Sequence, residues 1–540
     1  MSNEDVNSSS DLRSGLLAHA AAPPDPALRM GIDDALRLYA GEFGRWQLRH
    51  FVLTCSAWAL EAFHTMVMIF ADREPAWRCT AAVAGSLPDQ CGLPAGAWEW
   101  IEGASASTVS QWGLVCGQRY KVGFAQSAFF AGCMIGGGVF GHLSDSFLGR
   151  KGSLTVVCLL NAVFGLLTSL SPSYWLYTSL RFLTGFSTGG VGLCAFVLAT
   201  EPIGPAKRGV AGMSTFYFFS GGIALLSAVA YLFPSWRSLY VVSSLPSLLF
   251  LLLVLPFLSE SPRWYLIRRR TADAVNTLRK IAAGNGKCLP PGLTLKLDDE
   301  VDGVETHTNN GPKAESVGGK IPHSIESGSI LDVLRSPATR LRLILMVGIN
   351  FLCAVGYYGL SLNVVNLKTN LYLSVLLNAV AEMPAFVVTA LLLDRLGRKP
   401  LGVGTMLLSG AFCLAGFFAG VLGAMKTVIR MACGIVGIFG MAAMYNLLFI
   451  YTAELFPTVV RNAALGCVTQ ASQLGAILAP LVVVAGDGMP FAVFGCCGVA
   501  GALLAYYLPE TMNSPLYDTM AGLEDGERNC LGEEKDAYHR

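Results

Sequence analysis

Charge is scarce in this sequence: only 14% of its 540 residues are Asp, Glu, Lys or Arg, against about 25% in an ordinary soluble domain. Hydrophobic residues make up 53% of the chain, and the mean hydropathy is +0.51. A chain of this composition cannot hide its apolar surface from water by folding into globules alone, because a soluble domain also needs a polar exterior. The composition therefore excludes an ordinary soluble protein and predicts one that lies largely in lipid.

Several function classes lack their usual signatures. The formal net charge is only +1, and the basic patches that bind phosphate backbones are missing, so nucleic acid is not an expected partner. The phosphate loop Gly-x4-Gly-Lys-Ser/Thr is absent, which argues against direct use of ATP. The 15 cysteines show no zinc or redox spacing, and no nucleophile and base stand together beside a catalytic motif. We therefore expect neither an enzyme nor a cofactor or metal site.

Twelve stretches are long and apolar enough to cross a bilayer as helices, which takes about 20 residues each. The predicted spans are residues 51–71, 122–143, 153–172, 174–199, 209–232, 236–258, 341–361, 370–393, 400–421, 427–450, 463–485 and 489–508. Most connections are short, so neighbouring helices are expected to be antiparallel. The lipid bilayer is thus the first partner that the sequence predicts.

Two long connections organise the chain, 72–121 after the first span and 259–340 after the sixth. The predicted parts are an N-terminal tail, 1–50; a six-helix bundle, 51–258, that includes the loop 72–121; a central loop, 259–340; a second six-helix bundle, 341–508; and a C-terminal tail, 509–540. Lys and Arg concentrate in the short loops of one side, which predicts that the central loop and both termini are cytoplasmic.

Parts of the cytoplasmic segments are expected to be poorly ordered. The N-terminal tail is rich in Ser and Asp, and residues 284–329 combine Gly, Asn, Asp and scattered charge, a composition typical of solvated linkers. Between them, residues 272–283 have the apolar spacing of a helix and are expected to lie on the cytoplasmic surface.

The two predicted bundles carry the same charged landmarks at a nearly constant offset of 249 to 253 residues. The pairs are Asp145 and Asp394, Arg181 and Arg430, Glu201 and Glu454, Arg208 and Arg461, and Glu260 and Glu510. The run Gly-Arg-Lys also repeats, at 149–151 and 397–399. The sequence therefore predicts a duplicated six-helix unit, the architecture of carriers in which two bundles rock about a central site.

The repeated charges predict an ion-pair network at the cytoplasmic mouth. We expect it to form only when that mouth is closed, so that breaking it lets the two bundles exchange states. The alternative is that these charges merely anchor the helices under the positive-inside rule. The predicted members are Asp145, Gly149, Arg150, Lys151, Glu201 and Arg208 in the first half, and Asp394, Arg395, Gly397, Arg398, Glu454 and Arg461 in the second.

These features resemble the major facilitator superfamily, and four segments narrow the resemblance to its organic cation, anion and zwitterion transporters. The segments are Gly-Glu-Phe-Gly-Arg-Trp-Gln at 41–47, Trp-Gly-Leu-Val-Cys at 112–116, Glu-Ser-Pro-Arg-Trp at 260–264 and Tyr-Thr-Ala-Glu-Leu-Phe-Pro-Thr at 451–458. Residues 57–65, 144–151 and 181–190 are similar to plant organic cation/carnitine transporters. The resemblance runs from about Gly41 to Thr511.

The resemblance implies an all-α polytopic membrane protein with twelve transmembrane helices in a 6+6 pseudo-repeat. It further implies alternating-access transport of a small organic cation or zwitterion, of the carnitine, polyamine or quaternary ammonium class, by a monomer, with protons as a possible second partner. The plant group favours the vacuolar membrane, with the plasma membrane as the alternative. The stretched spacing from Asp145 to Gly149, compared with Asp394 to Gly397, departs from the family pattern and predicts an asymmetric network.

Two other functions stay open at this point. A proton-coupled sugar-type porter shares the fold, although segments 41–47 and 112–116 argue against it. A membrane sensor would signal through the 259–340 loop and bind solute without net transport, so a flux assay separates it from a carrier.

Two carboxylates lie inside predicted spans, where an ionised side chain costs several kcal/mol and marks a functional site. Glu61 lies in the middle of the first span and Glu382 in the eighth. Either could attract a cation or exchange a proton, and the alternative is a structural carboxylate satisfied by a neighbouring helix. His64 is one helical turn from Glu61 and is expected to be a packing residue.

A quaternary ammonium ion donates no hydrogen bond, so its site needs aromatic faces. The candidate wall residues are Phe216, Tyr217, Phe218, Phe219, Tyr357, Tyr358 and Tyr445, with Asn446 beside them. Tyr357 is supported by the resemblance, whereas a single Phe here is more often core or lipid-facing.

The resemblance also bears on a residue of the eleventh span and on the cysteines of the first loop. Relatives place an Asp for cations or an Arg for anions where this chain has Gln473, which could bind the carboxylate of a zwitterion through its amide. Cys79, Cys91 and Cys116 lie in the 72–121 loop, where one disulfide with a spare thiol is expected.

We expect Gln473→Asp to favour cations and Gln473→Arg to favour anions, because each variant adds a charge to the predicted site. Uptake of labelled carnitine, tetraethylammonium and an organic anion by cells expressing each variant measures the change. Unchanged selectivity in both variants would remove Gln473 from the site.

Overall fold

The computed structural model describes residues 29–80, 90–93, 97–296, 330–419, 425–486, 488–512, 517, 520, 522 and 523. The chain divides into two compact units. A small unit comprises Met1–Phe51, Thr200–Arg208 and Ser259–Ala314, and a large unit comprises Val52–Ala199, Gly209–Leu258 and Glu315–Arg540. Much of the predicted N-terminal tail, and the predicted linker from 297 on, lie outside the described residues.

In the described part of the chain, twelve helices are long and apolar enough to cross a membrane. Their helical segments are α3 (Arg45–Ala71), α5 (Tyr120–Asp145), α6 (Gly149–Ser169), α7 (Tyr174–Thr200), α8 (Pro205–Leu232), α9 (Trp236–Leu249), α13 (Pro337–Leu362), α14 (Leu371–Leu396), α15 (Arg398–Phe418), α16 (Lys426–Leu455), α17 (Thr458–Val484) and α18 (Met489–Tyr506). Short turns extend α9 through η4 (Phe250–Val254) and η5 (Leu255–Phe257), and α13 through η6 (Asn363–Leu367). The prediction of an all-α membrane protein with twelve spanning helices is confirmed.

The predicted helix ends are less accurate than the helix count. Helix α3 begins at Arg45 rather than 51, α8 at Pro205 rather than 209, and α16 continues to Leu455 rather than 450. Apolar composition predicts only the segment that lipid covers, whereas backbone hydrogen bonding continues the helix through polar residues beyond it.

Helices α5 and α7 pack backbone against backbone through two reciprocal Gly-x3-Gly pairs. A Cβ added to Gly132 or Gly136 of α5 would lie 2.1 Å from Phe182 O or 1.8 Å from Phe186 O of α7. A Cβ added to Gly185 or Gly189 of α7 would meet carbonyl oxygens of α5 at 2.0 and 2.2 Å. Such close approach is how helices gain dispersion energy in lipid, where the hydrophobic effect between them is absent. In the second half, Gly410 of α15 and Gly498 of α18 make a similar contact.

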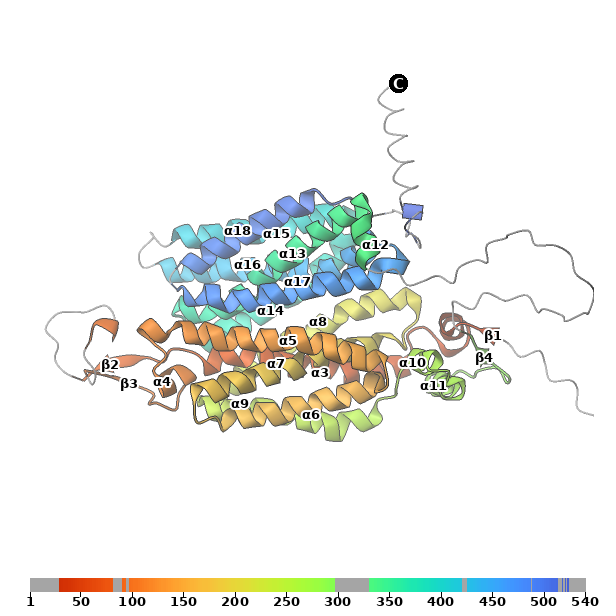
Figure 1. Ribbon diagram of the computed structural model, residues 1–540, viewed down its shortest axis with the longest axis horizontal. Helices are drawn as coiled ribbons and strands as arrows, with labels where there is room; N and C mark the ends of the chain where they lie inside the picture. Colours follow the sequence, from red (N-terminus) through yellow and green to blue (C-terminus); the bar gives the residue numbers. More distant parts are fainter. Residues whose placement is uncertain are drawn as a thin grey trace, which may run out of the picture. The chain divides into compact units, whose positions relative to one another are not determined.

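The segment after α3 lies beyond one end of the helices of the large unit, which we call the loop end (Figure 1). It contains a two-stranded antiparallel sheet of β2 (Trp77–Cys79) and β3 (Trp98–Trp100), the turn η2 (Gln90–Gly92), helix α4 (Thr108–Trp112) and the turn η3 (Cys116–Gln118). Cys91 and Cys116 form a disulfide, and Cys79 is an exposed free thiol. The expectation of one disulfide with a spare thiol is confirmed.

Several contacts between the first and second halves of the large unit lie toward the loop end. Helix α5 packs along α17, where Ser127 Oγ donates to Ile477 O at 2.7 Å. The rings of Phe70, at the end of α3, and Tyr372, at the start of α14, stack at 5.6 Å. Ser227 Oγ of α8 donates to Tyr372 O at 2.6 Å. The two halves are therefore joined at this end of the helices.

The small unit has its own apolar core. It contains β1 (Arg29–Met30), α2 (Ile32–Ala35), η1 (Leu36–Ala40), α10 (Pro262–Ile267), α11 (Thr271–Gly284) and β4 (Thr294–Leu295). Leu36, Leu278 and Ile281 are buried together, and β1 pairs with β4 in parallel. The helix predicted at 272–283 is confirmed by α11. The prediction that the chain after 284 is a solvated linker is wrong for residues 285–296, because β4 buries Leu295 against this core.

Short helix α12 (Ile330–Arg335) precedes α13 in the large unit, at the end opposite the loop end (Figure 1). We call this opposite end the motif end, because the repeated Asp and Arg-Lys runs lie there. The six helices of each half thus enter and leave at these two ends in alternation.

We expect Gly136→Ala to destabilise the protein by at least ~2 kcal/mol, because the added methyl group overlaps Phe186 O and the two backbones must separate. Gly138→Ala is the matched control on the same helix, since nothing lies within 4 Å of its Cβ position. The measurement is the thermal unfolding midpoint of each variant in detergent. Equal midpoints for the two variants would contradict the packing described here.

Candidate functional site

Glu382 is a buried acidic residue of the large unit. It lies midway along α14 and is 1% exposed. Its Oε2 accepts a hydrogen bond from Ser220 Oγ of α8 at 2.5 Å, and its Oε1 accepts one from the Tyr357 hydroxyl of α13 at 3.2 Å. Ser220 belongs to the first half of the chain and Tyr357 to the second. The carboxylate is therefore held between the two halves, with one hydroxyl donor from each.

Aromatic rings surround this position. Tyr357 stacks on Tyr445 at 5.3 Å, and Tyr445 is 6.4 Å from both Tyr358 and Phe216. Three further rings contact Phe216: Trp58 at 5.6 Å, Phe386 at 5.8 Å and Phe449 at 5.6 Å. The ring of Phe130 lies 4.9 Å from that of Tyr358. Rings from α3, α5, α8, α13, α14 and α16 thus meet in one aromatic cluster. The π faces of such rings attract a cation.

The aromatic residues of α8 that the sequence predicts to line the site lie partly inside this cluster and partly at its edge. Phe216 lies inside it, Phe219 is buried at 6.4 Å from Trp58, and Tyr217 is half-buried with its ring 5.4 Å from Phe386. Phe218 is half-buried. Phe216 is therefore the predicted α8 residue with the strongest place in the cluster.

Two amide side chains lie near the aromatic cluster with different surroundings. Asn446 follows Tyr445 on α16 and is 1% exposed, yet neither its Oδ1 nor its Nδ2 finds a hydrogen-bond partner among the described residues. Gln473 of α17 is half-buried and makes no hydrogen bond within the described part of the chain. Its neighbour Ser472 instead reaches the Tyr445 hydroxyl at 3.1 Å.

The open space at this site is small. A cavity of about 20 Å³ is lined by Asn350, Tyr445, Phe449, Thr469, Ser472 and neighbouring residues of α16 and α17. That volume holds about one water molecule.

Glu61, on α3 of the first half, is a second buried carboxyl group. Its Oε2 is buried without a hydrogen-bond partner among the described residues, and it lies where a Cβ at Gly192 of α7 would be, 2.0 Å away. Only glycine at 192 leaves room for this carboxylate. The His64 ring is fully buried beside Gly165, and Arg181 donates to the His64 carbonyl at 3.1 Å.

Sequence reasoning missed a buried polar network at the loop end of the first half. Asp72 accepts hydrogen bonds from Thr108 and Tyr177, both at 2.7 Å, and from Gln126 at 3.2 Å, and the Tyr177 hydroxyl lies 2.9 Å from that of Tyr240. The pKa of the Asp72 carboxyl lies above its ordinary value, because burial raises it more than these hydroxyls lower it. The Asp directly after an apolar span was the available signal.

Arg181 is the buried cation of this region. Its guanidinium lies over the Phe129 ring at 4.2 Å and the Tyr240 ring at 5.5 Å, and it is 1% exposed. Its positive charge also lowers the pKa of Asp72. We assign Arg181 to the packing of the first half, where aromatic faces and a carbonyl oxygen hold it.

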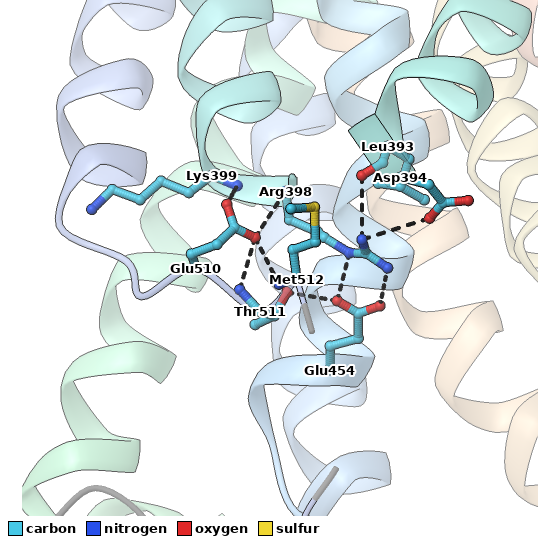
Figure 2. Close-up of polar contacts among 8 residues, drawn as sticks. All are labelled: Leu393, Asp394, Arg398, Lys399, Glu454, Glu510, Thr511 and Met512. Carbon is cyan, nitrogen blue, oxygen red and sulfur yellow. Dashed lines mark hydrogen bonds and ion pairs between the residues drawn. The ribbon is translucent and has the colours of Figure 1, made fainter. Parts of the chain in front are cut away.

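In the second half, the predicted charged residues form a hydrogen-bonded network at the motif end, drawn in Figure 2. Arg398 binds Glu454 with two bonds, Nε to Oε2 at 2.9 Å and Nη2 to Oε1 at 2.8 Å, and lies 3.7 Å from Asp394. Gly397 has a φ of +89°, which L side chains rarely adopt, and Arg395 is exposed. The bidentate pair links the start of α15 to the end of α16.

Glu510 extends this network beyond α18. It accepts backbone hydrogen bonds from Arg398 at 2.9 Å and Lys399 at 3.0 Å, while Thr511 Oγ1 donates to Glu454 at 2.6 Å (Figure 2). Burial alone would raise the pKa of Glu510, but these backbone N–H groups outweigh it and hold the pKa below its ordinary value. The network therefore joins α14, α15, α16 and the segment after α18, all within the second half.

The first-half counterparts differ in their partners. Arg150 is buried and pairs with the exposed Asp145 at 2.8 Å, and Lys151 donates to Leu258 O at 2.8 Å. Gly149 has a φ of +76°. Glu201 lies just beyond the end of α7 and is half-buried. The longer spacing from Asp145 to Gly149 is thus accommodated by an i to i+5 ion pair, in place of i to i+4.

The two arginines expected to follow Glu201 and Glu454 behave differently. Arg208 lies in the small unit, where Asp33 accepts from Arg208 at 2.8 Å and also from Arg263. Burial raises the pKa of Asp33, but the two guanidiniums lower it further, so the net pKa is below its ordinary value. Arg461 of α17 is half-buried, and its Nε has no partner in the part of the chain that the structure describes. The motif-end charges of the two halves therefore have different partners.

We expect Arg398→Ala to destabilise the protein by ~3 kcal/mol, because it leaves the half-buried Glu454 carboxylate without its bidentate partner. Arg395→Ala is the matched control, since this neighbouring arginine is exposed. Thermal unfolding in detergent measures both. Equal losses of stability in the two variants would show that the ion pair does not hold this half together.

Comparisons with known proteins agree with this architecture. Residues 100–521 match the family described as sugar (and other) transporter. The chain is 64% identical over 501 residues to organic cation/carnitine transporter 4 of Arabidopsis thaliana, covering 92% of each protein. It is 35% identical over 508 residues to organic cation/carnitine transporter 2 of the same plant, covering 91% of this chain and 93% of the relative.

Among solved structures, the xylose transporter XylE from E. coli, in a partially occluded inward open conformation, aligns with a TM-score of 0.61. The alignment covers 87% of this chain and 100% of XylE at 18% identity, which shows a shared fold. The relatives and the fold are those of multi-pass membrane transporters, not of enzymes. The chain therefore belongs to the organic cation/carnitine transporters of the major facilitator superfamily, with twelve spanning helices in a duplicated six-helix arrangement.

Proposed function

We propose that this protein moves a small organic cation or zwitterion, of the carnitine, polyamine or quaternary ammonium class, across a membrane by alternating access. The observation that carries the proposal is Glu382, a carboxylate buried between the two halves and surrounded by aromatic rings. In a low-dielectric interior, a negative charge attracts a cation far more strongly than it does in water. The relatives named organic cation/carnitine transporters support the same substrate class.

The aromatic cluster supplies the second part of the proposed binding site. Tyr357, Tyr445 and Phe216 come from three helices of both halves and would contact a methylated ammonium group. Each ring adds about 0.5–2 kcal/mol through cation–π attraction. A neutral sugar would gain little from a buried carboxylate with both oxygens already hydrogen-bonded, so we do not favour the sugar-type porter. A sensor without transport lacks a specific observation in its favour.

A zwitterion such as carnitine also carries a carboxylate. We assign the amides of Asn446 and Gln473 to this group, because neither amide makes a hydrogen bond in the described part of the chain. An amide N–H donates to a carboxylate without repelling a nearby ammonium. Tyr217 lies at the edge of the aromatic cluster and would contact only the longer cargo molecules.

The transport cycle would begin from the arrangement described above. Contacts such as those of Tyr372 with Phe70 and Ser227 join the two halves at the loop end. Opening toward the motif end would admit or release cargo, and closing there would separate the loop-end contacts. We propose that the motif-end network of Arg398, Glu454 and Glu510 keeps the second half rigid during this movement.

Energy for accumulation would come from the substrate gradient, the membrane potential or protons. A single positive charge gains about 2.3 kcal/mol per 100 mV of potential. Glu61 is the proposed proton carrier, since its Oε2 is buried and has no hydrogen-bond partner in the described residues, whereas Glu382 is engaged by two hydroxyls.

We place the motif end and both termini in the cytoplasm, because the basic residues of the short loops gather there. The vacuolar membrane is the favoured location, with the plasma membrane second, and a single chain is the proposed working unit. One chain supplies both halves of the site, so no partner subunit is required to complete it.

We expect Glu382→Gln to reduce uptake of labelled tetraethylammonium at least ~10-fold, the equivalent of 1.4 kcal/mol, because the variant keeps the shape of the side chain and removes its charge. Uptake is measured in cells that express equal amounts of each variant at the membrane. Glu99→Gln is the control, since Glu99 is an exposed residue paired with Arg78 in the loop segment. Parent-like uptake by Glu382→Gln would refute the proposed site.

A further inference from the structure

The hydroxyl groups of α8 fall into two kinds. Ser214 and Thr215 donate to carbonyl oxygens of their own helix, Val210 O at 2.8 Å and Gly212 O at 2.7 Å, which is the usual choice for such residues. Ser220 and Ser227, seven residues apart on one face, instead donate to acceptors on α14. Ser227 reaches a backbone carbonyl, whereas Ser220 reaches the Glu382 carboxylate.

The bond from Ser220 changes what Glu382 can offer to a ligand. Ser220 is fully buried, and its Oγ is 2.5 Å from Oε2. The Tyr357 hydroxyl binds Oε1, so in the described structure each carboxylate oxygen already accepts one hydrogen bond. The negative charge remains available to a cation, but the favourable acceptor positions on both oxygens are partly occupied.

The hydrogen bonds from Ser220 and Tyr357 affect the binding of some ammonium ions more than that of others. A quaternary ammonium has no N–H group, so charge and aromatic contact are all that it can use, and the two hydroxyls do not compete with it. A primary ammonium has three donors and gains most when it hydrogen-bonds directly to a bare carboxylate. Here each carboxylate oxygen already accepts one hydroxyl hydrogen bond, so a primary ammonium finds fewer free acceptor positions than a bare carboxylate would offer.

On the basis of the proposed function, we infer that Ser220 is a specificity-determining residue: its hydrogen bond to Glu382 makes the site favour fully alkylated ammonium ions over primary amines. The preference arises from the donor that Ser220 places on Oε2, while Glu382 and the aromatic cluster supply the binding itself. Removing the donor frees an acceptor position that only a ligand with N–H groups can use.

The test uses Ser220→Ala and the matched control Ser227→Ala, which removes an equivalent hydroxyl from the same face of α8 without touching the carboxylate. The half-saturating concentrations for uptake of tetraethylammonium and cadaverine are measured for the parent and both variants. We expect the ratio of the two values to shift toward cadaverine by at least ~5-fold in Ser220→Ala, as for loss of one hydrogen bond to a charged group. The ratio stays at the parent value in Ser227→Ala.

An unchanged ratio in Ser220→Ala, or an equal shift in Ser227→Ala, overturns the inference. A parent protein that takes up tetraethylammonium but no cadaverine is a separate case. In that case, cadaverine uptake by Ser220→Ala supports the inference, and no cadaverine uptake by this variant overturns it. Tyr357→Phe removes the donor on Oε1 and is expected to shift the ratio in the same direction, which keeps the test available if Ser220→Ala is not produced. Failure of the parent to transport either cation, or parent-like uptake by Glu382→Gln, would instead refute the proposed function.

Discussion

The rest of the structure depends on one carboxyl group that is buried in the interior of a membrane protein. An isolated charge there is unfavourable by several kcal/mol, unless hydrogen bonds or an opposite charge compensate it. Glu382 receives two hydroxyl hydrogen bonds, from Ser220 in the first half and Tyr357 in the second. The bond from Ser220 joins the two halves at this depth, whereas the bond from Tyr357 lies within the second half. Under the proposed function, the group that binds the cation is therefore also a group that joins the halves.

The remaining architecture makes movement at that interface possible by making each half rigid. In the first half, α5 and α7 touch through glycines whose Cβ positions are filled by carbonyl oxygens of the partner helix. In the second half, Arg398, Glu454 and Glu510 tie α14, α15, α16 and the segment after α18 together. Such packing leaves few low-energy ways for a half to deform, so the displacement that transport requires is concentrated between the halves.

The sequence predicted the twelve helices well, because every span must present a long apolar run to lipid. It also predicted the duplication, because the same charged residues recur at corresponding positions of the two halves. It also predicted Glu382 and Tyr357 as site residues, and the structure brings these two together. It did not predict Ser220, Trp58 or Phe386, since a serine or an aromatic residue inside an apolar helix gives no sign of which neighbour it will face. Partners set by tertiary packing were also missed: Arg208 binds Asp33, and residues 285–296 are ordered by the small unit's core, because these contacts join segments far apart in the chain.

The central claim is that this chain carries a permanent cation through a site between its halves, and flux in a defined membrane tests it most directly. The full-length protein is purified and reconstituted into liposomes, and an inside-negative potential is imposed with a potassium gradient and valinomycin. Our account predicts that labelled tetraethylammonium accumulates in these vesicles, that the accumulation disappears when the potential is abolished with a second ionophore, and that protein-free liposomes stay empty. Vesicles that contain folded protein and exclude every ammonium ion offered would contradict the account.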